Sequence, residues 1–147
     1  MSKQYYVLPV EFGTPEFDST VRLRDKILRK PLNLEFTVDQ ISDEHDQTHL
    51  ACYNERVEIV GCLVLKKVNK TNIKMRQVAV DDDSQGEGVG TRLVEAGEVY
   101  AKENGFKVME LHARDVAIPF YQKLKYKKVG KQFEEVGIKH YRMEKKL

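Results

Sequence analysis

A glycine-rich turn in the second half of the chain joins two segments whose apolar residues repeat with different periods. Before the turn, Asn72 to Val80 is strand-like, and after it the apolar residues of Val89 to Asn104 recur at three- and four-residue spacing, as in an α-helix. The pair Asn104-Gly105 supplies a helix stop, and Lys107 to Leu111 is again strand-like. A strand, a helix and a strand in this order cross over right-handed, so we expect the two strands to be parallel.

The rest of the chain predicts that the sheet also contains antiparallel strands. Two strand-like runs, Thr48 to Tyr53 and Val57 to Lys67, are joined at hairpin spacing and form an antiparallel meander with Asn72 to Val80. A helix is expected from Pro15 to about Lys30, because proline favours the first helical position and Pro31 stops the helix. The remaining expected elements are strands at Gln4 to Val10, Lys127 to Gly130 and His140 to Glu144, and a helix at Val116 to Leu124.

The composition fits one ordinary globular domain over residues 1–147. The chain is 41% hydrophobic and 33% charged, and it has no repeat, linker or low-complexity tract. No window approaches the roughly 18 apolar residues of a membrane-spanning helix. Met1 to Val10 lacks the apolar core of a secretory signal, so we expect a cytoplasmic protein that does not enter a membrane.

Cys52 and Cys62 are expected to be free thiols. If a hairpin turns at residues 55–56, Cys52 faces Ile59 in the neighbouring strand. In the same register Cys62 faces His49, so the two thiols are not partners.

Positive charge gathers at the C-terminal end of the chain. The net charge is +2, yet residues 121–147 carry nine Lys or Arg against three Glu. We interpret these lysines as the solvated surface of a helix and an edge strand. No basic motif interleaved with aromatic residues accompanies them, so nucleic acid is not an expected partner.

The turn itself, Asp81 to Thr91, has the chemistry of an anion-binding site. Gly86, Gly88 and Gly90 stand at alternate positions and allow positive φ angles and close approach of a ligand to the backbone. The amides that open the following helix have no partner within it and point outward, which suits a pyrophosphate. A plain tight turn is the competing interpretation. No Gly-Lys-Ser/Thr follows, which excludes a P-loop, and the dinucleotide-binding fingerprint is absent.

Three segments together carry a resemblance to a known family. Gln85, Gly88 and Gly90 fill the pattern Q/R-x-x-G-x-G/A. Gln77 to Val80 stands where the family has the end of its fourth strand, and Ala117 to Tyr126 is similar to the later segment A-x-x-x-Y-x-K-x-G-F/Y. On these motifs the chain resembles the GNAT superfamily of acyl-CoA-dependent N-acetyltransferases, and the order of elements agrees over essentially the whole chain.

The resemblance implies a fold and a cofactor. The fold is a mixed α/β sheet, mostly antiparallel and flanked by helices, whose central parallel pair splays apart to hold acetyl-CoA. The pantetheine arm would add to the fourth strand along the backbone of Val78, Ala79 and Val80. The pyrophosphate would bind amides of the turn, around Gly86, Gly88, Gly90 and Thr91. Gln85 would fix this turn or touch the phosphate, and Arg114 stands where the family often has Asn and could reach a phosphate.

The resemblance also supplies a candidate general acid. Tyr121 matches the family tyrosine that protonates the sulfur of coenzyme A, and a free phenol with a pKa of about 10 is protonated at neutral pH. The competing interpretation packs Tyr121 in the core with its hydroxyl satisfied. An amine must be neutral before it attacks a thioester, so the reaction also needs a base.

The sequence does not single out that base. Glu110 and His112 share one strand face and are expected to form a hydrogen-bonded structural pair. His140, Glu134 and Glu135 lie where the family places substrate-side strands and loops. A water chain is a further route for the proton.

The run from Ser42 to Asp46 mixes three carboxylates with one imidazole. Its contiguity is typical of a solvated loop rather than a metal cage, so no metal is expected. As a hypothesis, its negative charge attracts an amine substrate. His49, beside a predicted strand, is expected to be a packed histidine.

These observations favour an N-acetyltransferase that moves an acetyl group from acetyl-CoA to a primary amine of a small molecule or peptide, by direct attack in a ternary complex. A non-catalytic acyl-CoA-binding module is the alternative, and the two differ in whether acetyl-CoA is consumed when amines are offered. A nucleic-acid interaction domain is a third class, for which binding would depend steeply on salt. The acceptor, the acyl-chain preference and the oligomeric state, a homodimer included, stay open.

Overall fold

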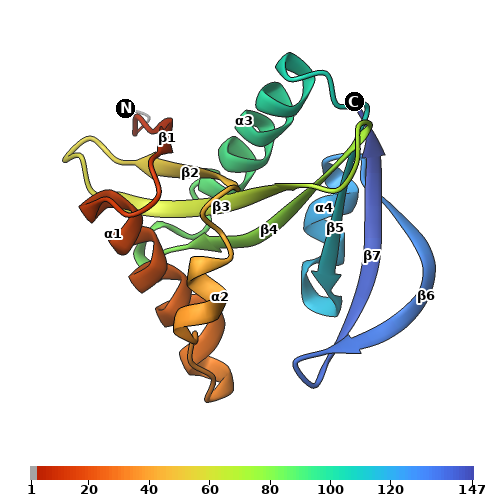
Figure 1. The fold of residues 1–147 in the computed structure, drawn as a ribbon, viewed down its shortest axis with the longest axis horizontal. Coiled ribbons are helices and arrows are strands. Elements are labelled where there is room, and N and C mark those ends of the chain that lie inside the picture. The colour runs from red at the N-terminus through yellow and green to blue at the C-terminus, as the bar shows by residue number, and fades with distance from the viewer. Residues whose placement is uncertain (1–2) are drawn as a thin grey trace.

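The computed structural model describes residues 3–147 and contains one seven-stranded sheet (Figure 1). The strands are β1 (Tyr6–Val10), β2 (Thr48–Tyr53), β3 (Ile59–Lys67), β4 (Asn72–Val80), β5 (Val108–Arg114), β6 (Lys127–Glu135) and β7 (Ile138–Lys146). Their order across the sheet is β1-β2-β3-β4-β5-β7-β6, and every neighbouring pair is antiparallel except β4 and β5. The predicted mixed, mostly antiparallel sheet with one parallel pair is therefore confirmed.

Helices cover both faces of this sheet. The α-helices are α1 (Pro15–Arg24), α2 (Val38–Ser42), α3 (Val89–Glu103) and α4 (Ile118–Lys123). Shorter helical turns are a π-helical turn at Asp25–Arg29 and 3₁₀ turns at Lys30–Leu32, Asp82–Ser84 and Asp115–Ala117. Side chains of β3 alternate between the faces, so Leu63 packs with Leu93 of α3 while Cys62 packs with Leu23 of α1.

The parallel pair separates into a fork. β4 and β5 are paired only from Asn72–Met75 to Val108–Leu111, and beyond this point they diverge (Figure 1). The register between β3 and β4 shifts between Cys62 and Val64, which leaves an extra residue on β4. Gln77 lies in this bulge with a φ of 54°, a left-handed conformation that bends the strand away from its neighbour.

A buried ion pair joins α1 to the segment after α2. The Arg24 guanidinium donates two hydrogen bonds to the Glu44 carboxylate, at 2.8 and 2.7 Å, and both side chains are almost fully buried. The Arg76 guanidinium on β4 donates a third, at 3.0 Å. Burial raises the pKa of Glu44, but the hydrogen bonds and charges of Arg24 and Arg76 outweigh burial and lower that pKa overall. The expectation of a solvated loop is therefore wrong for Glu44, because the arginine in the apolar face of α1 requires a buried partner.

Several predicted boundaries agree with the structure and others are displaced. Thr14 caps α1, and its side chain accepts a hydrogen bond from the Phe17 amide. Pro31 does not stop the helix, because it lies inside the 3₁₀ turn and the chain reverses at Asn33 in a left-handed conformation. His49 is packed as expected, 3% exposed, with Nε2 3.0 Å from the Glu44 carbonyl.

The hairpin of β2 and β3 has a different register from the one expected. Cys52 lies opposite Gly61 and Cys62 lies opposite Ala51, two residues away from the predicted pairing. The difference arises because the turn includes Val57 in a left-handed conformation and a bulge follows it. Both cysteines are buried free thiols, as expected.

The C-terminal strands are longer than predicted and carry the basic residues on their outer surface. β6 is the edge strand of the sheet, and Lys127, Lys128 and Lys131 are exposed on it, as expected for a solvated edge. Among the helices of residues 3–147, none is both long and apolar enough to span a bilayer.

Candidate active site

The turn between β4 and α3 is fixed by Gln85. Its side-chain amide donates a hydrogen bond to the Val80 carbonyl at 3.1 Å and another to Asp82 at 3.4 Å. These bonds tie the middle of the turn to the end of the strand, so Gln85 holds the loop closed in front of α3. Its contact with a phosphate stays a prediction.

The N-terminus of α3 presents backbone amides that have no hydrogen-bond partner in the described part of the chain. Gly88 precedes the helix with a φ of 83°, and no side chain among residues 3–147 caps the first turn. A Cβ atom at Gly88 would meet nothing within 4 Å, so the left-handed backbone, and not a lack of space, requires glycine here. Gly86 has the same conformation, and Gly90 and Thr91 belong to the first helical turn.

Gly90 also allows two helices to approach each other. A Cβ atom at this position would lie 3.2 Å from the ring of Phe120, which is closer than an ordinary carbon contact. Phe120 belongs to α4, which has Pro119 in its first turn as expected. Gly90 therefore has a packing role in addition to its expected place in the anion site.

The negative charge in the turn is offset by the N-terminal part of the chain. Glu87 accepts a hydrogen bond from Lys3 Nζ at 2.6 Å and another from the Tyr5 hydroxyl. The hydrogen bond from Lys3 and then that from Tyr5 lower the pKa of Glu87. Asp81 forms an ion pair with Lys26 at 2.8 Å. Two of the four carboxylates of the turn, those of Asp81 and Glu87, thus already have a cationic partner.

β4 has an open edge beyond the fork. Over residues 3–147, β4 pairs with β5 only as far as Met75, so the edge of residues 76–80 that faces β5 has no strand partner. An extended chain that contains amides can add to such an edge through main-chain hydrogen bonds. Val78 lines the cavity in the fork, Ala79 is buried, and Val80 packs against the main core.

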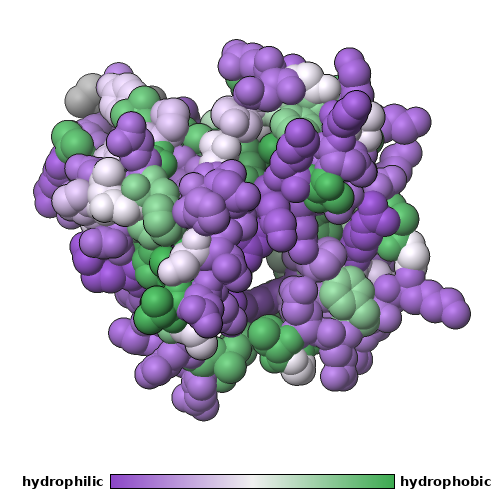
Figure 2. Space-filling model, in the orientation of Figure 1, coloured by the Kyte–Doolittle hydropathy of each residue, from purple (hydrophilic) through white to green (hydrophobic). Residues whose placement is uncertain are grey.

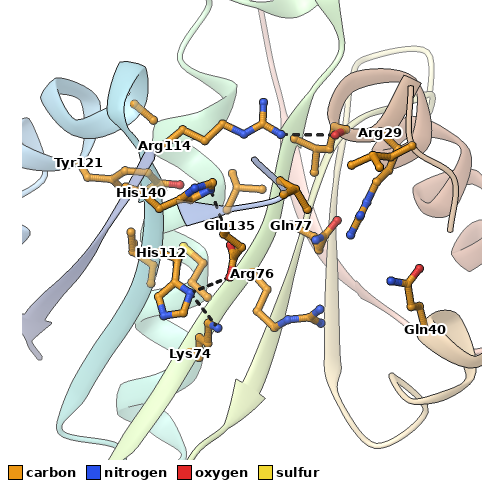
Figure 3. A pocket seen from close by; sticks show the side chains of 18 residues that line it. Arg29, Gln40, Lys74, Arg76, Gln77, His112, Arg114, Tyr121, Glu135 and His140 are labelled. Carbon is orange, nitrogen blue, oxygen red and sulfur yellow. Dashed lines mark hydrogen bonds and ion pairs between the residues drawn. The ribbon is translucent and has the colours of Figure 1, made fainter. Parts of the chain in front are cut away.

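A cavity of about 470 Å³ lies between the diverging strands. Figure 2 shows the molecule hollowed between its two halves, with hydrophilic residues over much of the rim. Figure 3 labels the polar side chains that line it, which are Arg29, Gln40, Lys74, Arg76, Gln77, His112, Arg114, Tyr121, Glu135 and His140. They come from the π-helical turn, α2, β4, β5, α4, β6 and β7, so the cavity is assembled from both ends of the chain.

Tyr121 on α4 reaches this cavity with its hydroxyl. The residue is buried, and Phe120 and Tyr126 pack edge-on against its ring. Burial raises the pKa of Tyr121 to about 12, so the phenol is protonated at neutral pH. The hydroxyl makes no hydrogen bond within residues 3–147 and points toward His140 in Figure 3. The ring therefore packs in the core while the hydroxyl is left for a molecule in the cavity.

Glu135 lies between two histidines. Its carboxylate oxygens are 3.2 Å from His112 Nδ1 and 3.6 Å from His140 Nε2 (Figure 3). His140 Nδ1 lies 2.8 Å from the Ile138 carbonyl, which can only accept, so this nitrogen carries the hydrogen. In the neutral ring Nε2 therefore keeps a lone pair, and it faces the Glu135 carboxylate. Two proton acceptors thus converge on one part of the cavity.

Glu110 and His112 do not form the expected pair. His112 contacts Glu135, whereas Glu110 accepts hydrogen bonds from Asn72 at 3.0 Å and from Arg142 at 3.1 Å. The two residues do share a face of β5, but neighbouring strands offer closer partners than a residue two positions along the same strand.

The other side of the cavity is rich in positive charge. The Arg29 guanidinium lies 4.4 Å from the centre of the Phe36 ring, and no carboxylate within residues 3–147 pairs with it. Burial lowers the pKa of Arg29, and the charges of Arg24, Arg76 and Arg114 lower it further. Lys74 lies on the opposite side, beside Glu135, with Nζ 3.4 Å from His112 Nδ1 (Figure 3), and burial lowers its pKa as well.

The predicted site residues fall into two adjoining groups. Val78, Arg114 and Tyr121 line the cavity, while Gln85, Thr91 and the three glycines form the turn at the end of β4. Arg114 donates to the Leu28 carbonyl at 3.4 Å, and its contact with a cofactor phosphate stays a prediction.

Four polar residues of the cavity escaped the sequence analysis, namely Arg29, Gln40, Lys74 and Arg76, and Gln77 was named there only as part of a strand end. Lys74 and Arg76 carried a usable signal, because two charged residues at period two in a central strand indicate a face that no helix covers. Arg29 carried none, since its position depends on the π-helical turn after α1. Gln77 carried none either, since it depends on the bulge in β4.

Comparisons with known proteins agree on one family. The family model of the acetyltransferase (GNAT) domain matches residues 29–147. A candidate acetyltransferase from Bacillus subtilis strain 168 is 30% identical over 126 residues, which is 80% of this chain and 84% of that protein. Among solved structures, a candidate N-acetyltransferase from Lactobacillus plantarum is similar with a TM-score of 0.85 at 19% identity, covering 100% of this chain and 99% of that one. A GNAT family acetyltransferase from Elizabethkingia anophelis with acetyl-CoA bound has a TM-score of 0.75 at 18% identity, covering 97% and 98%. The chain therefore belongs to the GNAT acetyltransferase family.

Proposed function

We propose that this protein transfers the acetyl group of acetyl-CoA to a primary amine of a small molecule or peptide, by direct attack in a ternary complex. The observation that carries the proposal is the set of side chains that meet in the cavity between β4 and β5. The Tyr121 hydroxyl, which has no hydrogen-bond partner within residues 3–147, faces a cavity in which His140 and Glu135 converge. An acid and a pair of proton acceptors at one site are what aminolysis of a thioester needs.

The residues of the fork and the turn fit acetyl-CoA. The free edge of β4 suits the amides of the pantetheine arm, with Val78, Ala79 and Val80 as the binding backbone. The unpaired amides of α3 suit the pyrophosphate, around Gly86, Gly88, Gly90 and Thr91. When bound, acetyl-CoA supplies an acylated thiol whose carbonyl an amine can attack. The structure related to this one from Elizabethkingia anophelis, which has acetyl-CoA bound, supports this assignment.

The protein's own groups handle the protons. The Tyr121 phenol donates its proton at the sulfur as the thiolate leaves, and it is suited to this because burial keeps it protonated. Before the attack, the lone pair of His140 Nε2 takes a proton from the substrate's ammonium group and leaves a neutral amine, with Glu135 beside the ring to stabilise the charge that develops on it. Among the candidates from the sequence, we therefore assign the base to His140, assisted by Glu135. Glu134 does not line the cavity and has no role in the reaction.

The decisive experiment offers a broad panel of primary amines to the purified protein with acetyl-CoA and measures release of the free thiol. Calorimetry with acetyl-CoA runs in parallel. Thiol release that depends on an amine, with an acetylated product in the mass spectrum, supports the proposal. Tight binding of acetyl-CoA without consumption on any amine contradicts it and favours the acyl-CoA-binding module.

Glu135→Gln and His140→Gln are each expected to lower kcat/KM for an amine acceptor by about tenfold. Each variant removes one of two converging acceptors and leaves the other, so the loss falls below the full effect of a general base. Steady-state kinetics measure the change. Glu134→Gln is the matched control, because this neighbouring carboxylate is exposed and lies outside the cavity. An equal loss in the control would refute the assignment.

Gly88→Ala is expected to weaken acetyl-CoA binding by about five- to thirtyfold. A Cβ atom in the left-handed conformation costs about 1–2 kcal/mol, and the turn relieves this strain only by leaving the geometry that exposes the α3 amides. Calorimetry measures the affinity. Gly105→Ala is the control, because Gly105 has nearly the same φ, 84°, at the other end of α3. If both variants lose affinity equally, the effect comes from strain in α3 and not from the turn.

A further inference from the structure

Within residues 3–147 the cavity lining combines one carboxylate with four cationic side chains, which are Arg29, Lys74, Arg76 and Arg114. Glu135 is the carboxylate of the lining within residues 3–147, and it lies beside His140 and close to Tyr121. Across the fork, Arg29 and Arg76 line the other side (Figure 3). Lys74 Nζ lies 3.4 Å from His112 Nδ1, beside Glu135, so positive charge exceeds negative charge in the cavity and a negative group is drawn toward the arginines.

On the side of the cavity formed by Arg29 and Arg76, the positive charge of the arginines exceeds the negative charge of the nearby carboxylate. Glu44 is the carboxylate of this group, and it is already hydrogen-bonded by both Arg24 and Arg76. The remaining guanidinium, that of Arg29, has one face against the Phe36 ring and no carboxylate partner in the described part of the chain. A half-buried guanidinium among other cations is unfavourable unless a ligand brings an anion, since its fork of N–H donors matches an oxyanion.

The phosphates of the cofactor do not meet this need. The lining of the cavity includes no residue of the turn at positions 81–91, where the pyrophosphate is placed. Arg29 lies after α1, and its side of the cavity is closed by Gln40 of α2 and Leu34. We therefore assign the anionic group that would pair with Arg29 to the second substrate.

We propose that the acceptor is an amino acid in the broad sense, a molecule that carries a carboxylate as well as the reacting amine, and that Arg29 binds this carboxylate. The inference rests on the proposed acetyl transfer, because it takes the amine to lie at His140 and Glu135. With the carboxylate held at Arg29, the amine of such a molecule points across the fork toward the proton acceptors. Arg29 would then both recognise the acceptor and orient its amine.

The test uses ω-amino acids of increasing chain length, each beside its primary amide, as acceptors with acetyl-CoA. The expected result is a kcat/KM about tenfold or more higher for the acid than for its amide, at the chain length that spans the fork. Spermidine, a polycation of similar length, is expected to be a poor acceptor. Equal kcat/KM values for acids and amides at every length would overturn the proposal.

Arg29 is tested through the ratio of acid to amide. In Arg29→Met the ratio is expected to fall toward one through a higher KM for the acid, and Arg29→Lys, which keeps the charge, is expected to restore part of it. Arg22→Met on the exposed side of α1 is the matched control and should keep the wild-type ratio. A wild-type ratio in Arg29→Met would assign the preference to another group and refute the role of Arg29.

A binding measurement separates this proposal from the proposed function. Calorimetry with coenzyme A-loaded protein compares an N-acetyl-ω-amino acid with its amide, and it needs no turnover. Preferential binding of the acid that is lost in Arg29→Met, without acetylation of any amine, would sustain the carboxylate site and reject catalysis. Acetylation of amides and acids alike, with no such preference in binding, would sustain catalysis and reject the carboxylate site.

Discussion

Tyr121→Phe is expected to lower kcat by about 100-fold or more, with acetyl-CoA affinity close to that of the wild type. The change removes one oxygen atom and keeps the ring that packs against Phe120 and Tyr126. Because the hydroxyl has no hydrogen bond within residues 3–147, its removal leaves no buried group unsatisfied. The loss would then report proton donation to the departing thiolate and not damage to the fold.

Steady-state kinetics with an acceptor found in the amine panel measure this effect, and calorimetry measures the affinity. Tyr141→Phe is the control, since Tyr141 on β7 also has a hydroxyl but lies outside the cavity lining. Burial raises the pKa of Tyr121 to about 12, so its ionisation should not limit activity between neutral pH and about 11. Unchanged turnover in Tyr121→Phe would exclude it as the acid.

Glu44→Gln is expected to lower the free energy of unfolding by about 3–5 kcal/mol. The variant removes the single negative charge that Arg24 and Arg76 share, and Arg24 remains almost fully buried, 1% exposed, with its charge uncompensated. Urea unfolding followed by circular dichroism measures the loss. Asp46→Asn is the matched control, because this carboxylate of the same run is exposed.

The same carboxylate predicts how stability depends on pH. Its pKa is lower in the folded protein than in the unfolded chain, where it is about 4.3. The stability that Glu44 contributes is thus fully present above the unfolded pKa and is lost as the pH falls through the folded pKa. The difference in unfolding free energy between wild type and Glu44→Gln should therefore narrow in acid. A constant difference would show that the charge of Glu44 is not what the fold requires.

Much of the scaffold follows from local patterns in the sequence. The bounds of β2 and β4 are those predicted, and α3 begins at Val89 as its apolar spacing indicates. The parallel pair follows from the strand, helix and strand order, because the helix returns the chain to the end of the sheet at which the first strand began. The turn at Gly88 is readable for the same reason, since its requirement for a left-handed residue is local.

The polar content of the cavity could not be predicted in the same way. Glu135 and His140 meet because β6 and β7 extend well beyond the predicted strands. Both strands contain few apolar residues, so the sequence pattern does not show how long they are. Arg29 and Glu44 take their places through a π-helical turn and a buried ion pair, which depend on contacts between distant segments. Sequence periodicity reports which face is buried and not which charges meet across a fork.

The short parallel ladder at Asn72–Met75 has a mechanical consequence for the molecule. It is the stretch of backbone hydrogen bonding that connects the β1–β4 half of the sheet to the β5–β7 half, so this seam resists separation less than a ladder of full strand length would. A ligand that hydrogen-bonds to the β4 edge and packs against α4 would add contacts between the two halves where β4 and β5 are not paired. Binding of the reactants in the cavity would then also restrict the motion of one half of the sheet relative to the other.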